Sequence, residues 1–191
     1  KLPALADEFM NYIDGSFEMT KRMAKKRKTI NTRKNGLYTM EVFIISGPVT
    51  EKFVESNSVI SRTIEIRGDQ TLKDLHHAMF GAFDREEEHL YEFQIGGRGP
   101  NDPKAKRYVL PGEFENPMGG VKPKGEVSKT TIISLKLKEN ESFGYWFDFG
   151  DDWWHQINVT SIKEKIPAGR YPRVIKRIGE SPPQYPDFEE E

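Results

Sequence analysis

Hydrophobic and polar residues alternate along several segments, which predicts a sheet accompanied by helices. Residues 37–46 (LYTMEVFIIS) and 60–67 (ISRTIEIR) are rich in β-branched and aromatic side chains and predict two strands. The connecting GPVTEKFVESNS carries turn residues, so we expect these strands to pair antiparallel. Residues 89–95 (HLYEFQI) predict a third strand and residues 107–110 a short fourth, whereas residues 130–137 (TTIISLKL) fit either a strand or a short helix.

Two segments have helical spacing instead. In residues 3–14, apolar positions recur every three or four residues, and Gly15 ends the pattern. A second helix is predicted after Thr71, because Thr71 and Asp74 have the spacing of a capping box. Its apolar side is made of Leu72, Leu75, His76, Met79 and Phe83.

The segment YWFDFGDDWWHQI predicts a hairpin. Residues 143–149 and 153–160 both have strand composition, and a turn is expected at Gly150 and Asp151. Successive strand residues point to opposite faces. Trp153 and His155 therefore share the face marked as buried by Ile157 and Val159, and Trp154 lies on the other face.

Composition excludes some classes of protein. The 191 residues include 29 Lys and Arg and 30 Asp and Glu, so no overall charge points to nucleic acid. Cysteine is absent, which rules out disulfides and cysteine-ligated zinc and fits a cytoplasmic protein. No apolar stretch reaches the roughly 20 residues that span a bilayer. Residues 96–128 hold seven Gly and five Pro, which is typical of a lid or binding loop.

A cluster of basic residues near the start of the chain suggests a second possible function. Residues 21–34 (KRMAKKRKTINTRK) contain eight basic side chains and no acid. They fit a solvated linker, or a cationic arm that binds nucleic acid through its phosphates. The candidate binding residues in this arm are Lys25, Lys26, Arg27 and Lys28.

Familiar catalytic motifs are incomplete. The DFG at residues 148–150 lacks the other protein-kinase motifs, and neither common nucleotide-binding glycine loop is present. His76 and His77 are neighbours on the predicted helix and point about 100° apart, so we do not expect them to share a metal. His155 fits a structural clasp with a nearby carboxylate, or a general base or metal ligand.

These residues resemble the root-inducing plasmid ORF-three-like family, also described as insertion-element passenger proteins of TnpR type. The resemblance covers about residues 37–185 and rests on Leu75-His76, on His89-Leu90 with Phe93, and on YWFDFGDDWWH from Tyr145 to His155. It implies a single α+β domain of no established activity. The family commonly ends in a CPPED-like segment, whereas this chain has GESPPQYPD, with Gln184 and Tyr185 where acids are expected.

Five positions in the motifs shared with this family are candidate catalytic residues. These are His76, His89, Asp148, Asp151 and His155. Four of them could bind a divalent metal. These are His76, His89, Asp151 and His155.

Together, the predictions describe an α+β protein with a mostly antiparallel sheet packed against helices. Residues 1–36 form a helical and basic extension, residues 37–180 the domain, and residues 181–191 a loose, acidic, proline-rich tail. The first functional hypothesis is a non-enzymatic module that binds a protein partner or other ligand, using Trp153 and Trp154, in a setting of plasmids or mobile elements. The alternatives are a metal-assisted hydrolase and nucleic-acid binding through residues 21–34.

Overall fold

A computed structural model describes residues 35–115 and 122–187. An eight-stranded sheet forms its centre, in the order β5-β4-β3-β6-β7-β1-β2-β8. The strands are β1 Leu37–Ser46, β2 Ser61–Arg67, β3 Tyr91–Ile95, β4 Lys106–Val109, β5 Gly125–Glu126, β6 Ser142–Phe147, β7 Trp153–Lys163 and β8 Arg173–Ile178. All neighbours pair antiparallel except β4 and β5, which are parallel. The expected α+β class with a mostly antiparallel sheet is therefore confirmed.

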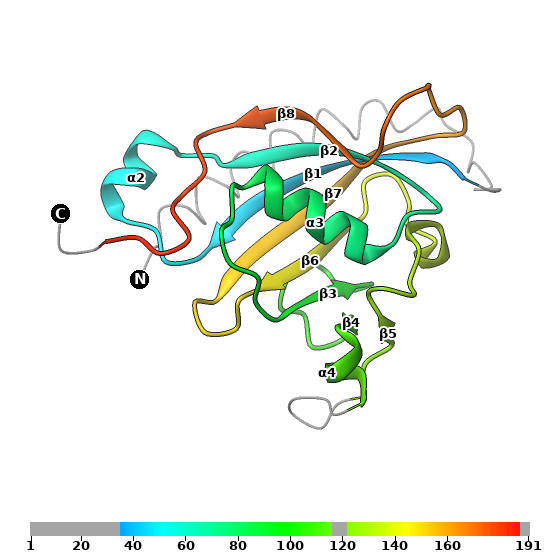
Figure 1. The fold of residues 1–191 in the computed structure, drawn as a ribbon, viewed down its shortest axis with the longest axis horizontal. Helices are drawn as coiled ribbons and strands as arrows, with labels where there is room; N and C mark the ends of the chain where they lie inside the picture. Colours follow the sequence, from blue (N-terminus) through cyan, green and yellow to red (C-terminus); the bar gives the residue numbers. More distant parts are fainter. Residues whose placement is uncertain (1–34, 116–121, 188–191) are drawn as a thin grey trace.

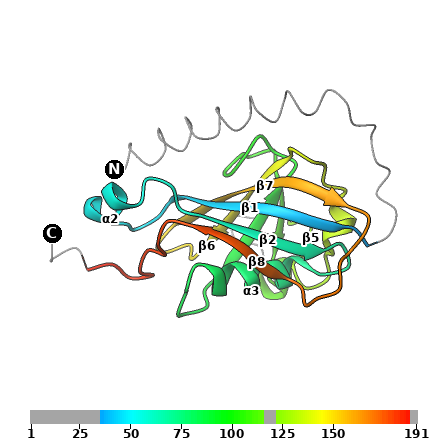
Figure 2. The same ribbon diagram turned by 90° about the horizontal axis from the view of Figure 1, so that it is seen from above.

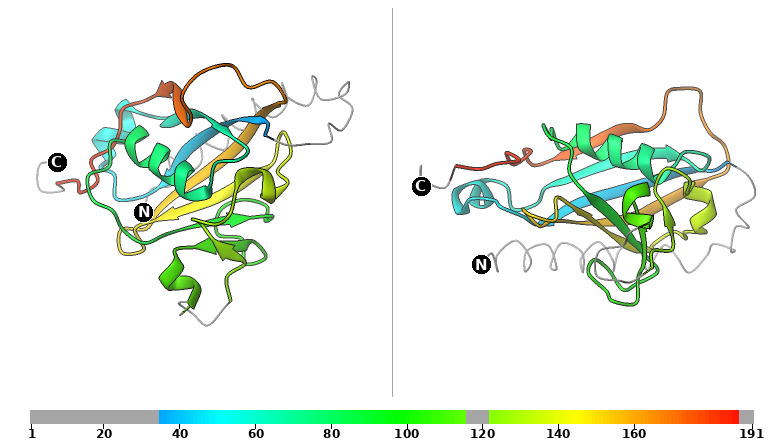
Figure 3. Two further views of the ribbon diagram at one scale, coloured as in Figure 1. Left: turned by 45° about the vertical axis from the view of Figure 1, so that its right-hand side comes forward. Right: turned by 60° about the horizontal axis from the view of Figure 1, so that its bottom comes forward.

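The helices are short, apart from one that crosses the sheet. They are α2 Glu51–Ser56, α3 Leu72–Ala82, α4 Pro111–Glu115 and a 3-10 helix Ile132–Leu135. Helix α3 runs across one face of the sheet (Figure 1), and the view from above places it on one side only (Figure 2). Helix α4 lies with β4 and β5 at one edge, opposite β8 (Figure 3).

The hydrophobic core lies between α3 and the sheet. Thr71 caps the helix with the expected capping box to Asp74. Leu75, His76 and Met79 on its inner side are buried, as the helical spacing predicted. They face strand residues that alternate inward, so burial follows the predicted parity of β7.

Several segments differ from the sequence predictions. Residues 51–56 form a helical turn capped by Thr50, where we expected only turn residues. Strand β8 was not predicted, because its exposed residues lack an apolar alternation. The described end of the tail is not loose, because the buried Gln184 side chain accepts hydrogen bonds from the backbone N–H groups of Glu86 and Glu87 at 2.8 and 3.0 Å.

Within the described residues, no helix is long and apolar enough to cross a membrane. The predicted helix at residues 3–14 and the basic arm at residues 21–34, with Lys25, Lys26, Arg27 and Lys28, lie outside the described residues. The nucleic-acid hypothesis based on that arm therefore stays a prediction.

Candidate functional site

Three aromatic rings are stacked on the face of the sheet opposite α3. Trp146 of β6 and Trp154 of β7 are direct cross-strand partners, with ring centroids 4.9 Å apart and nearly parallel planes. Phe149 continues the stack, 4.1 Å from the Trp146 ring. Each ring is half-buried, so the stack keeps surface open to solvent. Trp146 Nε1 is buried and has no hydrogen-bond partner among the described residues.

A buried carboxylate stands beside this stack. Glu92 on β3 is only 1% exposed and pairs with Arg107 of β4, whose Nε donates to it at 2.6 Å. Gln94 Nε2 donates to the same carboxylate at 2.7 Å. Because the Gln94 carbonyl accepts from the backbone N–H of Asn101 at 2.7 Å, the network also fixes the following loop.

That loop, residues 96–105, forms the opposite wall. Asp102 accepts from the backbone N–H groups of Arg98 and Lys104, which lowers the pKa of its carboxyl group. The loop reaches the sheet at Gly144, where an added Cβ would meet Pro100 at 2.8 Å. Loop and rings enclose an aromatic groove of about 540 Å³. The groove is lined by Glu92, Gln94, Asn101, Asp102, Pro103, Ala105, Arg107, Trp146, Phe149, Asp152 and Trp154.

The candidate histidines lie on the other face, under or beside α3. His76 is fully buried and stacks on Tyr91, with centroids 3.7 Å apart and planes 2° from parallel. Its Nδ1 is 2.7 Å from the Tyr145 hydroxyl, and its Nε2 is 2.8 Å from a carboxylate oxygen of Glu88. Burial lowers the pKa of His76 to about 4, so its ring is neutral at pH 7.

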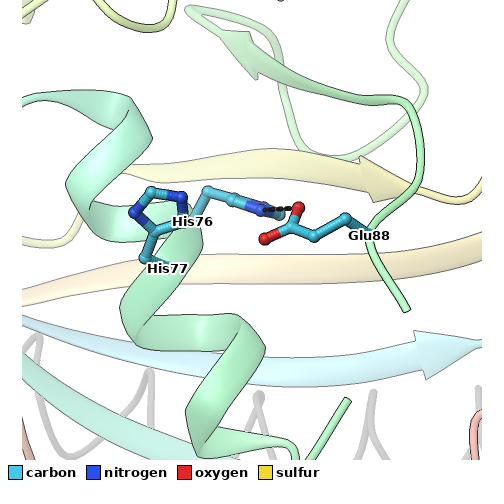
Figure 4. Close-up of side chains that lie close together, drawn as sticks. All are labelled: His76, His77 and Glu88. Carbon is cyan, nitrogen blue, oxygen red and sulfur yellow. Dashed lines mark hydrogen bonds and ion pairs between the residues drawn. The ribbon is translucent and has the colours of Figure 1, made fainter. Parts of the chain in front are cut away.

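Glu88 and the neighbouring histidine complete a group of three side chains. Figure 4 shows Glu88 reaching the His76 ring from the segment before β3, with His77 beside it on α3. The potential ligand atoms of His76, His77 and Glu88 all lie within 4.8 Å of one another. Helical spacing had led us not to expect a metal shared by His76 and His77, yet these atoms lie close enough for one ion. An adjoining pocket of about 530 Å³ includes His77, Glu88 and Lys73 in its lining.

A separate pair forms near the β6–β7 turn. His89 Nε2 lies 3.4 Å from Asp148 Oδ2 and 2.7 Å from the Tyr185 hydroxyl. The other Asp148 oxygen accepts from the backbone N–H groups of Gly150 and Asp151. Asp148 therefore closes the turn as well as contacting His89, and Asp151 takes part in this network through its backbone.

The remaining aromatic candidates belong to the core. Trp153 is fully buried, and the Arg85 guanidinium lies 3.7 Å from its ring centroid. His155 is 2% exposed and contacts the rings of Phe83 and Tyr145. Burial, aided by the positive charge of Arg85, lowers the pKa of His155 to about 3. Of the two tryptophans predicted to bind a ligand, only Trp154 borders the groove.

The structure therefore brings the predicted site residues together only in part. His89 meets Asp148, whereas His76 bonds to Tyr145 and Glu88, and His155 has no hydrogen-bond partner at Nδ1 among the described residues. The four predicted metal ligands, all of them described, are not one ligand group. Sequence reasoning overlooked Glu88, Glu92 and Arg107, because ordinary charged residues carry no motif when their partners are set by the path of a turn or by strand register.

Comparison with known proteins supports the fold and the predicted family. The crystal structure of a protein of unknown function, MM3350 from Methanosarcina mazei Go1, is similar with a TM-score of 0.59 and 22% identity, over 78% of this chain and 74% of that one. At this identity the likeness shows the fold alone. No curated protein matches this chain. The family described as plasmid pRiA4b ORF-3-like protein matches residues 52–185, which is more than half of the chain. The chain therefore belongs to the plasmid pRiA4b ORF-3-like protein family.

Proposed function

We propose that this protein is a non-enzymatic binding module and that its ligand occupies the aromatic groove. The observation that carries the proposal is the half-buried stack of Trp146, Trp154 and Phe149 beside the buried Glu92 carboxylate. Binding sites combine apolar surface with a few fixed polar groups in this way. The network through Gln94 and Asn101 holds the wall of the groove in place before a ligand arrives.

The charges of the groove favour a cationic group as its occupant. The ionisable lining residues are Glu92, Asp102, Asp152 and Arg107, so three negative charges and one positive charge give a net charge of −2. Arg98, which pairs with Asp102 from outside the lining, reduces the local net charge to −1. Aromatic faces attract cations as well, most strongly guanidinium and ammonium groups over tryptophan. We therefore propose that the groove receives an arginine or lysine side chain from a protein partner.

The cellular setting of this binding is also part of the proposal. The plasmid in the family's description supports an association with plasmid or mobile-element biology. The lack of cysteine supports a cytoplasmic location.

A fluorescence titration with short peptides tests the binding site. Peptides with one central arginine or lysine should quench or shift the tryptophan emission, and matched peptides with glutamate there should not. Trp154→Ala should weaken binding about 2- to 30-fold, the equivalent of the 0.5–2 kcal/mol of a cation–π contact. Thr160→Ala changes an exposed residue of the same strand outside the groove and should bind as the wild type does.

Two results would contradict the proposal. One is equal binding of the basic and acidic peptides, because the groove would then not select for charge. The other is binding that survives Trp154→Ala unchanged, because the ligand would then lie elsewhere. Melting curves of each variant separate a lost contact from a lost fold.

A further inference from the structure

We propose that His76, His77 and Glu88 form a binding site for a transition-metal dication, with Zn²⁺ as the best fit. Two imidazoles and one carboxylate are ligands that zinc accepts, and three protein ligands leave one tetrahedral position open. The site lies on the α3 side of the sheet, whereas the aromatic groove lies on the opposite face. The proposal is therefore independent of the proposed peptide binding.

The geometry requires the exposed side chains to move, because ligand atoms that now lie within 4.8 Å of one another must approach to about 3.3 Å. Zinc bonds of about 2.0–2.2 Å at a tetrahedral angle place the ligand atoms about 3.3 Å apart. The Glu88 oxygen is now 2.8 Å from His76 Nε2, so it would retreat by about half an ångström to admit the ion. His77 is exposed and the Glu88 side chain is 55% exposed, so both are free to adjust.

The buried ligand, by contrast, is already fixed. His76 is held by stacking on Tyr91 and by the 2.7 Å contact of its Nδ1 with the Tyr145 hydroxyl. Imidazoles that bind metals are commonly oriented by a partner at the second ring nitrogen. In the bound state the proton would reside on Nδ1 and be donated to the Tyr145 oxygen, so that Nε2 offers its lone pair to the ion.

The site opens to solvent on one side. His77 and Glu88 line the pocket of about 530 Å³, so a water molecule or a small ligand could take the fourth position. Lys73 lines the same pocket and is the positive charge that opposes a cation there. Replacing it with alanine should tighten metal binding.

Equilibrium dialysis of the full chain, prepared without a histidine tag, tests the site. We expect about one Zn²⁺ per chain and a higher melting temperature with Zn²⁺ than without. His77→Ala and Glu88→Gln should each weaken binding at least tenfold and abolish the melting shift. Glu87→Gln, a neighbouring exposed carboxylate outside the ligand group, should retain both.

Each contrary result has a defined meaning. Absence of Zn²⁺ uptake by the folded wild type would overturn the proposal. An equal loss of Zn²⁺ affinity in Glu87→Gln would show that surface carboxylates attract the ion without a specific site, and would overturn the proposal. A loss in His89→Ala that matched the loss in His77→Ala would assign the ion to a different set of ligands, and would also overturn it.

Discussion

Protonation of His155 should destabilise the fold as the pH falls below neutrality. The ring is 2% exposed and lies among aromatic side chains, with the Arg85 charge nearby. Its pKa falls from an ordinary value of 6.5 to about 3 in the folded chain. Between these two pKa values, His155 is protonated in the unfolded state and neutral in the folded state. The contribution of His155 to stability is complete above pH 6.5 and is lost progressively as the pH falls toward 3.

The size of this effect follows from the two pKa values. Between pH 7.5 and pH 5, the free energy of unfolding should fall by about 2 kcal/mol through His155 alone. Urea unfolding at the two pH values measures the total fall, to which other ionisable groups contribute. In His155→Phe, which keeps a ring against Phe83 and Tyr145, the fall should be smaller by about 2 kcal/mol.

Two further variants make the comparison specific. Thr160→Ala changes an exposed side chain that carries no ionisable group and should leave the pH dependence as it is in the wild type. His155→Gln does not titrate either, so it should match His155→Phe in slope even where its absolute stability differs. The reasoning is refuted if both His155 variants lose as much stability as the wild type between pH 7.5 and pH 5.

Three further predictions concern the packing that positions the two faces. Gly47→Ala should destabilise the protein by about 1–3 kcal/mol, because the new Cβ would lie 2.2 Å from the Trp153 ring; an unchanged urea midpoint would contradict this packing. Gly81→Ala in α3 meets no atom within 4 Å and should stabilise by up to about 1 kcal/mol in the same assay. Gln184→Ala should lower the free energy of unfolding by about 1–3 kcal/mol and speed hydrogen exchange at the amides of Glu86 and Glu87. Unaltered exchange at these amides would show that the tail does not protect them.

Much of the fold could be predicted because burial leaves a periodic trace in the sequence. Strand β1 coincides with the predicted 37–46, and the buried side of α3 is the predicted one. Strand β8 shows no such periodicity, because the side chains of this edge strand are mostly exposed and no face of it is buried. Helix α2 is six residues long and depends on the Thr50 cap more than on apolar spacing.

The site was harder to predict because its contacts join residues that no local pattern connects. His76 and Glu88 are twelve positions apart, and the intervening turn decides whether they meet. Arg107 reaches Glu92 because β4 pairs with β3 in one particular register. Gln184 stands where an acid was expected, and its amide can both accept from two backbone N–H groups and donate to the Glu87 carbonyl, as a carboxylate cannot.

The segment from Tyr145 to His155 is best explained by the register of one hairpin. Alternation sends Tyr145 and His155 into the core beneath α3 and turns Trp146 and Trp154 toward the groove. A shift of one residue would exchange the two sets, burying the tryptophans and exposing the histidine. The Asp148 side chain and carbonyl hold the turn against such a shift by accepting from the backbone N–H groups of Gly150, Asp151 and Asp152. The aspartate of this motif therefore serves both faces by fixing the register on which each depends.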